Sequence, residues 1–147
     1  MGNRLLVLAL ATVLSSPCVG GAGAALPTSP DIAITPPAPD LALELAAFSG
    51  IREGVWDGVL PSRLIVERID ATSARVVYIW GAHPDGNFQA GYSRRNAKVL
   101  PGGKIEFGGA GRPYFVFTMS RDRTSIAGAR ESQGQVATTT MKRVAEQ

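Results

Sequence analysis

Between Gly54 and Val144 the sequence is a nearly continuous series of short, strand-like segments separated by turn residues. About eight segments are present, and they are rich in Val, Ile, Thr, Phe and Tyr, which favour β-strands. No stretch between them is long enough for the crossover helix that parallel strands require. Sequential neighbours are therefore expected to pair antiparallel, as a meander.

Closure into a barrel is the expected architecture, because a barrel removes the exposed sheet edges that invite aggregation. About eight strands enclose an interior that side chains fill or that holds one small ligand. We therefore predict an all-β fold, a small closed barrel preceded by a short helix and a Pro-rich linker, with a two-sheet sandwich as the alternative. The expected strands are Gly54–Leu60, Arg63–Asp70, Ala74–Gly81, Gly91–Leu100, Lys104–Phe107, Tyr114–Arg121, Ser125–Glu131 and Gln135–Val144.

Alternating hydrophobicity supports this closure. In the third segment, the period-2 pattern predicts that Val76, Tyr78 and Trp80 face the interior. The second segment follows this alternation less well. If its side chains alternate strictly between the two faces, the apolar Ile69 lies on the same face as the charged Glu67.

The first 24 residues have the features of a secretory signal peptide. Arg4 is followed by a mostly apolar run over residues 5–14, and the segment ends in Ala22-Gly23-Ala24. This order predicts cleavage before Ala25 and an exported protein, periplasmic or secreted. The apolar run is shorter than the roughly 20 residues that cross a bilayer, so no transmembrane segment is expected in the mature chain.

Cys18 offers a lipoprotein anchor as the alternative, since bacterial lipoproteins are cut just before an acylated cysteine. Pro17 stands directly before the cut and opposes it, so the signal peptide is favoured over the anchor. Cys18 is the only cysteine of the chain. After cleavage the mature chain is therefore expected to contain no disulfide.

Residues 25–39 are predicted to be a Pro-rich linker, since this stretch contains five of the ten prolines of the chain. Proline fixes φ and donates no ladder hydrogen bond, so an extended, semi-rigid segment is expected. Residues 40–50 are predicted to form a short helix N-capped by Asp40, with its leucines and Phe48 covering one end of the barrel. Residues 51–147 then form the barrel domain.

The segment Gly54-Val-Trp56, followed by a turn and an alternating apolar strand, resembles the first hairpin of calycin-type barrels, the group of lipocalins and avidins. In lipocalins the tryptophan closes the base of the barrel and a basic residue of the last strand covers it. The resemblance covers residues 50–144 and implies structural roles for Gly54, Trp56 and Arg143.

The resemblance implies the fold and not the family's ligand chemistry. The chain lacks the lipocalin disulfide, and the biotin-contacting residues of avidins have no match in it. The chain is also similar to short exported proteobacterial proteins that have no assigned activity.

No catalytic residue, metal or cofactor is predicted. His83 is the only histidine and lies beside the turn-like Pro84-Asp85-Gly86, whereas a catalytic base needs a nucleophile within hydrogen-bond reach. One histidine with no mature cysteine does not make a zinc site. The formal net charge of +3 is modest and the arginines are scattered, so no nucleic-acid partner is expected. Whether the chain is an enzyme stays open, with a non-enzyme favoured.

Binding is the function that remains, and the sequence is compatible with two kinds of binding. In the first, the barrel holds a small hydrophobic or amphipathic ligand, with aromatic walls and one arginine for a carboxylate; the competing interpretation is a solid core. In the second, residues 25–40 form an arm that binds a protein partner, as in protease inhibitors. The candidate ligand-binding residues are Tyr78, Trp80, Tyr92, Arg94, Phe115, Phe117 and Arg130.

Overall fold

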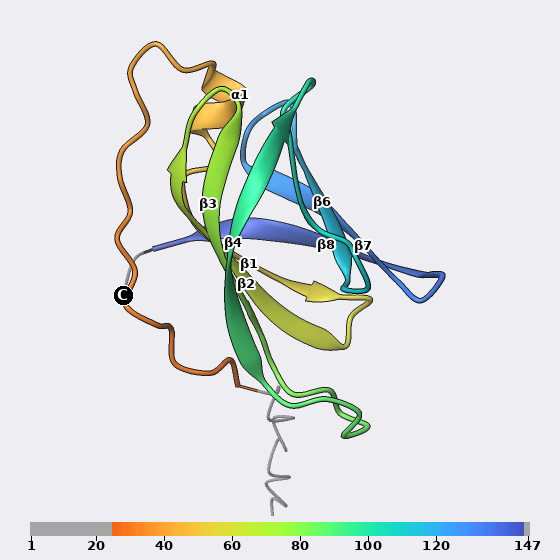
Figure 1. The fold of residues 1–147 in the computed structure, drawn as a ribbon. Coiled ribbons are helices and arrows are strands. Elements are labelled where there is room, and N and C mark those ends of the chain that lie inside the picture. Colours follow the sequence, from red (N-terminus) through yellow and green to blue (C-terminus); the bar gives the residue numbers. More distant parts are fainter. Residues whose placement is uncertain (1–24, 146–147) are drawn as a thin grey trace, which may run out of the picture.

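Every strand of the barrel pairs antiparallel with its neighbour in sequence, and the first strand pairs with the last to close it (Figure 1). The computed structural model describes residues 25–145. The prediction of an all-β meander closed into a small barrel is confirmed, and a two-sheet sandwich is excluded. The strands are β1 (Gly50–Trp56), β2 (Leu60–Ile69), β3 (Ser73–Trp80), β4 (Gly91–Leu100), β5 (Lys104–Gly108), β6 (Tyr114–Met119), β7 (Ser125–Ser132) and β8 (Gln135–Val144).

The helix before the barrel is shorter than the sequence suggests. It comprises only α1 (Leu43–Ala46), its N-cap is Ala42, and no side chain caps it, so the predicted N-cap at Asp40 is wrong. The predicted last residue of the helix, Gly50, belongs to the sheet, because it pairs with Val66 and extends β1 beyond its predicted start. Hydrogen bonds between strands thus replace those of a last helical turn.

One end of the barrel is closed by the segment around α1. Phe48 is completely buried, and Leu41 and Leu45 pack against the interior cluster. Leu43 is 65% exposed. The expectation that this segment covers one end of the barrel is confirmed, except at Leu43.

The interior is built by side chains that alternate between the inner and the outer face along the strands. Val76 and Tyr78 of β3 are buried inside the barrel, as are Phe115 and Phe117 of β6, whereas Val77 of β3 belongs to a separate outer cluster. The predicted inward face of β3 is therefore confirmed.

A β-bulge at Glu67 explains the poor alternation of β2. The register passes from Val66 opposite Val76 to Arg68 opposite Arg75, so Glu67 is the extra residue. A bulge shifts all later side chains of its strand to the other face. Ile69 consequently joins the interior cluster, and the expectation that it shares the face of Glu67 is wrong.

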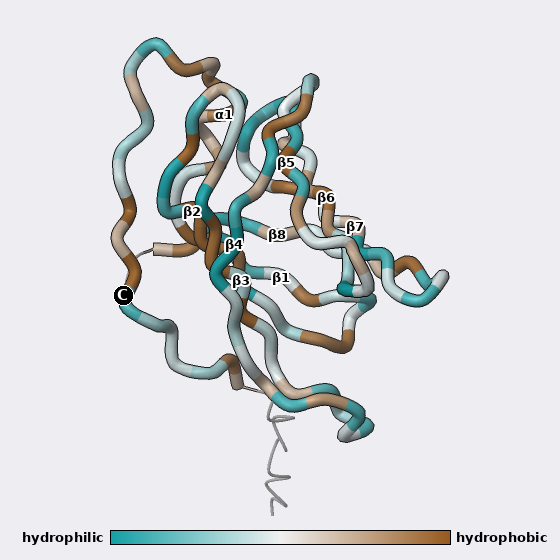
Figure 2. The backbone as a smooth tube through the Cα atoms, viewed as in Figure 1, coloured by the Kyte–Doolittle hydropathy of each residue, from teal (hydrophilic) through white to brown (hydrophobic). Residues whose placement is uncertain are grey.

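Residues 25–40, which we call the arm, lie along the outside of the barrel, from the end with the β3–β4 loop up to α1 (Figure 1). Leu26, Ile32 and Ile34 of the arm pack on a second apolar cluster on the outer face of the sheet. Figure 2 shows hydrophobic segments both in the arm and in the strands. The cluster under the arm consists of Ile51, Ile65, Val77 and Ile79, with Val144 beside it.

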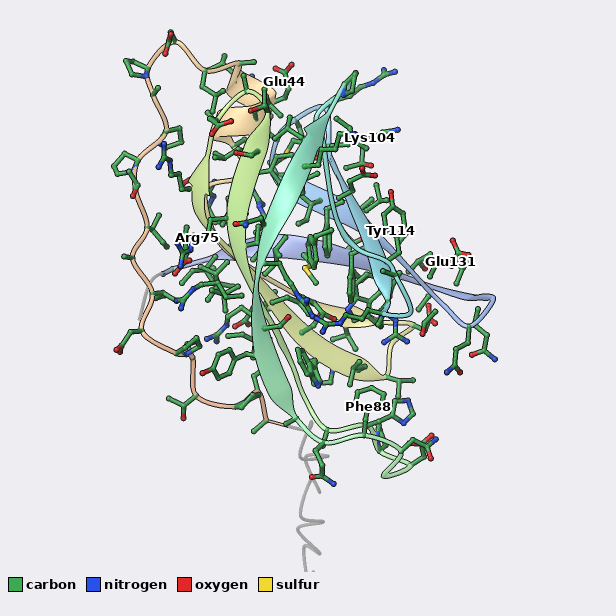
Figure 3. All side chains as sticks on the ribbon, viewed as in Figure 1. Glu44, Arg75, Phe88, Lys104, Tyr114 and Glu131 are labelled. Carbon is green, nitrogen blue, oxygen red and sulfur yellow. The ribbon has the colours of Figure 1, made fainter. Side chains whose placement is uncertain are left out.

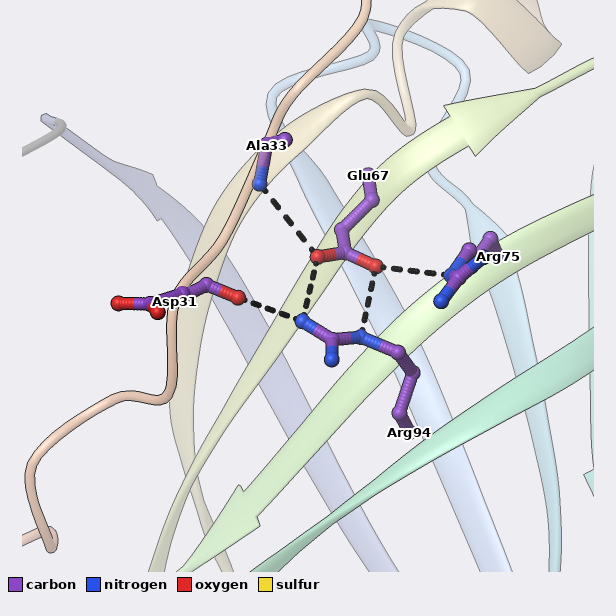
Figure 4. A network of polar contacts seen from close by, with 5 residues as sticks. All are labelled: Asp31, Ala33, Glu67, Arg75 and Arg94. Atoms are coloured by element: carbon purple, nitrogen blue, oxygen red, sulfur yellow. Dashed lines mark hydrogen bonds and ion pairs between the residues drawn. The ribbon is translucent and has the colours of Figure 1, made fainter.

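Polar contacts at the bulge fix the arm to the barrel (Figure 4). The backbone N–H of Thr35 donates to the Glu67 carbonyl at 2.8 Å, which the bulge takes out of its regular ladder position. The Glu67 carboxylate accepts from Arg94 at 2.9 and 3.0 Å and lies 3.3 Å from Nε of Arg75. Arg94 also donates to the Asp31 carbonyl at 2.6 Å. The arm is thus part of the folded domain.

No helix within residues 25–145 has the length and apolar character needed to cross a membrane. The predicted signal peptide and Cys18 lie outside the described residues.

Candidate functional site

A cavity of about 700 Å³ opens at the end of the barrel opposite α1. Its rim comes from the β1–β2 turn, the β3–β4 loop, the β5–β6 loop and the β7–β8 turn, each of which contributes lining residues. Antiparallel meanders bring every second connection to the same end, and this topology gathers the four loops there. Ligand pockets occupy ~300–1,000 Å³, so the cavity has room for one small molecule.

Aromatic rings form the floor of the cavity. The ring centroids of Tyr78 and Phe115 lie 4.7 Å apart, and those of Phe107 and Phe115 lie 5.0 Å apart. Trp80 stacks on Tyr78 at 5.7 Å and extends the floor toward the mouth. The interior is therefore filled with side chains in its closed half and hollow in its open half.

Trp56 supports this floor from below. Its indole Nε1–H donates to the Tyr78 hydroxyl at 2.8 Å, and its ring makes edge contacts with Phe115 and Phe117. Burial raises the pKa of the Tyr78 phenol to about 12, against the hydrogen bonds from Trp56 and Ser62 and the charge of Arg130. The phenol is neutral at physiological pH, and its oxygen accepts the Trp56 hydrogen bond that ties the floor together.

Three arginines line the cavity, namely Arg95 of β4, Arg112 of the β5–β6 loop and Arg130 of β7. Within residues 25–145, no carboxylate lies within ion-pair distance of any of the three. Nε of Arg95 donates to the Ser93 hydroxyl at 3.3 Å, whereas Nε of Arg130 is buried without a hydrogen-bond partner. The wall thus carries positive charge that these described side chains leave unneutralised.

The acidic groups of the lining are already engaged. An Asp57 carboxylate oxygen accepts from the Thr138 N–H at 2.9 Å. The Asp85 carboxylate is paired with His83 and accepts from the backbone N–H of Asn87. The backbone hydrogen bond from Asn87, and then the contact with His83, lower the Asp85 pKa. Both carboxylates therefore stabilise turns at the rim and leave the positive charge of the arginines uncompensated.

The β3–β4 loop makes the largest part of the mouth. Phe88 extends from it (Figure 3), lines the cavity and lies 5.3 Å from the His83 ring. The Trp80 indole N–H donates to the Gln89 carbonyl at 2.9 Å and ties the loop to the floor. The apolar floor is therefore continuous with an aromatic rim.

The candidate ligand-binding residues fall in three places. Tyr78, Trp80, Phe115 and Arg130 line the cavity together. Phe117 lies below the floor, fully buried in the closed half. Tyr92 and Arg94 lie on the outer face of β4, where Tyr92 is 52% exposed and Arg94 holds the arm.

Strand register explains why Tyr92 and Arg94 are outside. Tyr78 pairs with Ser93, and Val76 pairs with Arg95. Directly opposite residues of an antiparallel pair share a face, so the odd-numbered residues of β4 point inward. Arg95 is one of two lining arginines that the sequence did not predict; the missing signal was this register, which the long β3–β4 loop hides. Arg112 was missed because it lies in a loop that has no alternation.

The residues implied by the calycin resemblance lie at two different heights in the barrel. Gly54 lies where β1 and β8 meet, and a Cβ there would be 2.7 Å from the Thr140 carbonyl oxygen. Arg143 lies opposite Arg52 at the closed end and donates to the Ala47 carbonyl at 2.8 Å. Arg143 therefore contacts the chain at the far end of β1 from Trp56.

The buried cation at the closed end is Arg52, which is 1% exposed. It donates to the carbonyls of Ala47 and Thr124. Burial and, to a smaller extent, the charge of Arg143 lower the Arg52 pKa to about 10. The guanidinium is still charged at neutral pH, and it ties the α1 segment to the β6–β7 turn.

Chemistry that needs a clustered metal-ligand set is not supported by the part of the chain that the structure describes. No group of three or more His, Cys, Asp or Glu side chains there is close enough to hold a metal ion. The arrangement can enclose an apolar body on aromatic rings and place an acidic group against arginine.

No protein-family model matches the chain, and no curated protein matches it. The functional argument therefore rests on the cavity itself.

Proposed function

We propose that this chain is an exported, non-catalytic binding module of the calycin type, which holds a small amphipathic ligand in the open half of its barrel. The cavity of about 700 Å³, with an aromatic floor and arginine walls, is the observation that carries this proposal. Pockets with mostly apolar walls and a few placed polar groups are typical ligand sites. The eight-stranded closed meander supports the calycin type, and the N-terminal sequence pattern supports export.

The packing of the arm bears on the alternative function, in which residues 25–40 bind a protein partner. Ile32 and Ile34, the apolar residues of the arm's centre, pack on the barrel. A partner that bound these two side chains would therefore have to displace the arm from its own domain first. The ligand-binding proposal needs no such rearrangement.

Native mass spectrometry of residues 25–147, purified after export, tests the proposal. We expect a reproducible excess mass that denaturation releases. A chain with the sequence mass alone, which also fails to bind the apolar probe 8-anilinonaphthalene-1-sulfonate, would overturn it.

A matched pair of variants locates the binding. Ala137 of β8 lines the cavity, whereas Ala129 of β7 is exposed on the outer face. Ala137→Phe should fill the cavity and abolish probe binding, and Ala129→Phe should leave it unchanged. Far-UV circular dichroism checks that both variants fold, and Ser93→Phe replaces Ala137→Phe if that variant does not fold. Equal probe binding by all folded variants would place the ligand outside the cavity.

A further inference from the structure

We infer that the ligand is an amphipathic carboxylate, whose acidic group contacts Arg130 and whose apolar body lies on the aromatic floor. This inference rests on the proposed function and adds the chemical class of the ligand and its anchoring residue.

Arg130 occupies the inner face of β7 at the level of the floor. It pairs across the sheet with Phe115 on one side and with Ala137 on the other, and all three residues line the cavity. The charge of Arg130 also acts on the nearby Tyr78 phenol. Arg130 therefore lies between Phe115 of the floor and the small Ala137 on the inner face of the sheet.

The hydrogen-bonding capacity of Arg130 is unused within the described chain. Its Nε is buried and has no hydrogen-bond partner. Burying a donor without an acceptor costs free energy, and more so when the donor is charged. The same atom therefore provides binding free energy for an acceptor that enters the cavity.

Two strand arginines that have carboxylate partners show what Arg130 lacks. On the outer face, Arg94 forms a two-point pair with Glu67, and Arg63 pairs with Glu53. On the inner face no glutamate or aspartate within residues 25–145 forms an ion pair with Arg130. Since buried donors are normally paired, the acceptor for the buried Nε–H of Arg130 is expected to come from the ligand.

A carboxylate is the acidic group that fits best. The guanidinium is planar and offers parallel N–H donors that match the two oxygens of a carboxylate. Arg130 supplies one charge at the floor, whereas Arg112 is exposed at the rim and Arg95 already donates to Ser93. One positive charge at the floor is balanced by one negative charge, and the rim arginines attract anions toward the mouth.

The body of the ligand is expected to be apolar and flat. Tyr78, Phe107 and Phe115 present closely spaced rings beside Arg130. Aromatic rings favour offset or edge contacts with a second ring, in addition to the area that they bury. Phe88 at the mouth extends the same apolar wall.

Isothermal titration calorimetry with matched probes tests the inference. We would compare 2-naphthoate with its neutral analogue 2-naphthalenemethanol and with 2-naphthyl phosphate. The unaltered chain should bind the carboxylate about 10-fold or more tightly than the alcohol, the usual effect of one charge-assisted hydrogen bond. Arg130→Met should remove this preference and leave the affinity for the alcohol within about 3-fold.

Arg121→Met is the matched control, because Arg121 is exposed in the β6–β7 turn at the closed end. It should leave both affinities unchanged. Arg130→Gln replaces Arg130→Met if the latter does not fold.

The outcomes separate the two proposals. Equal binding of acid and alcohol by the unaltered chain overturns the inference and leaves the proposed function standing. An acid preference that survives in Arg130→Met overturns the assignment to Arg130, and tighter binding of the phosphate overturns the carboxylate class. Binding of no probe, together with a clean native mass, overturns the proposed function.

Discussion

Arg94 donates two hydrogen bonds to the Glu67 carboxylate on the outer face of the barrel, from Nε at 3.0 Å and from Nη2 at 2.9 Å. The pair lies directly under the arm, since Arg94 also donates to the Asp31 carbonyl (Figure 4). Glu67 thereby connects the bulge of β2, the next two strands and the N-terminal segment.

Glu67→Gln should loosen the arm, because an amide cannot accept from both arginines as a carboxylate does. Arg94 and Arg75 are partly exposed, so we expect a loss of only about 1–2 kcal/mol in the free energy of unfolding. Urea denaturation measures this loss, and limited proteolysis should show faster cleavage between residues 25 and 40. Glu131→Gln, at an exposed position of β7, is the control and should change stability by less than about 0.5 kcal/mol. Unchanged proteolysis of Glu67→Gln would contradict this role.

Tyr78→Phe removes the acceptor of the Trp56 indole N–H and keeps the ring that forms the floor. A buried donor left without a partner costs about 1–3 kcal/mol, and we expect a destabilisation in this range. The exposed Tyr92 provides the control, because Tyr92→Phe should be nearly neutral. Chemical denaturation followed by tryptophan fluorescence compares the two variants, and equal stabilities would show that the hydrogen bond contributes nothing.

Gly54→Ala should strain the seam between β1 and β8. The added Cβ would lie 2.7 Å from the Thr140 carbonyl oxygen and 2.8 Å from Cγ of Met141, so backbone has to move. We expect a destabilisation of about 1–3 kcal/mol, as for overpacking elsewhere. Val55→Thr, at the exposed neighbouring position, should stay within about 0.5 kcal/mol. A Gly54→Ala variant as stable as Val55→Thr in thermal unfolding would mean that the seam tolerates a side chain.

Asp70 makes stability depend on pH at the β2–β3 turn. Its carboxylate accepts from the backbone N–H groups of Thr72 and Ser73. These bonds, followed by those from the two hydroxyls, lower the Asp70 pKa from 3.8 to about 2. A depressed carboxyl pKa stabilises the fold above the unfolded value and loses this effect as pH falls through the folded value.

Asp70→Asn should therefore be less stable than the unaltered chain at neutral pH. The difference in melting temperature should shrink between pH 3.8 and about 2. Ala71→Ser, at the exposed neighbouring position, should show a difference that does not depend on pH. A constant gap for Asp70→Asn across this range would refute the role of the turn carboxylate.

The fold could be predicted from the sequence because its signals are local. Turn residues mark almost every strand end, and the absence of crossover segments leaves antiparallel neighbours as the only pairing. The start of β1 was missed, because Gly50 and Ile51 follow a leucine-rich segment that favours a helix. Their place in the ladder depends on the distant Val66 and Ile65, and no local pattern reports such a contact.

The candidate site could be predicted only in part, because an inward face depends on register as well as alternation. Tyr78, Trp80 and Phe115 lie in strands whose own pattern reveals the inner face. Both faces of β4 carry polar residues, so its pattern does not show which face points inward. Only the pairing with β3 shows that Arg95, and not Arg94, faces the interior. Loops carry no such pattern, and Arg112 had no signal at all.

The apolar patch beneath the arm consists of residues from β1, β2, β3 and β8. Its buried members are brought together by the pairing of β1, β2 and β3 alone, and β8 adds only Val144. The segment that leaves the ribosome before the barrel strands therefore finds most of its docking surface once the first three strands have paired. In pulse-labelled refolding, the Thr35 amide should accordingly gain protection no earlier than the amides that join β1, β2 and β3.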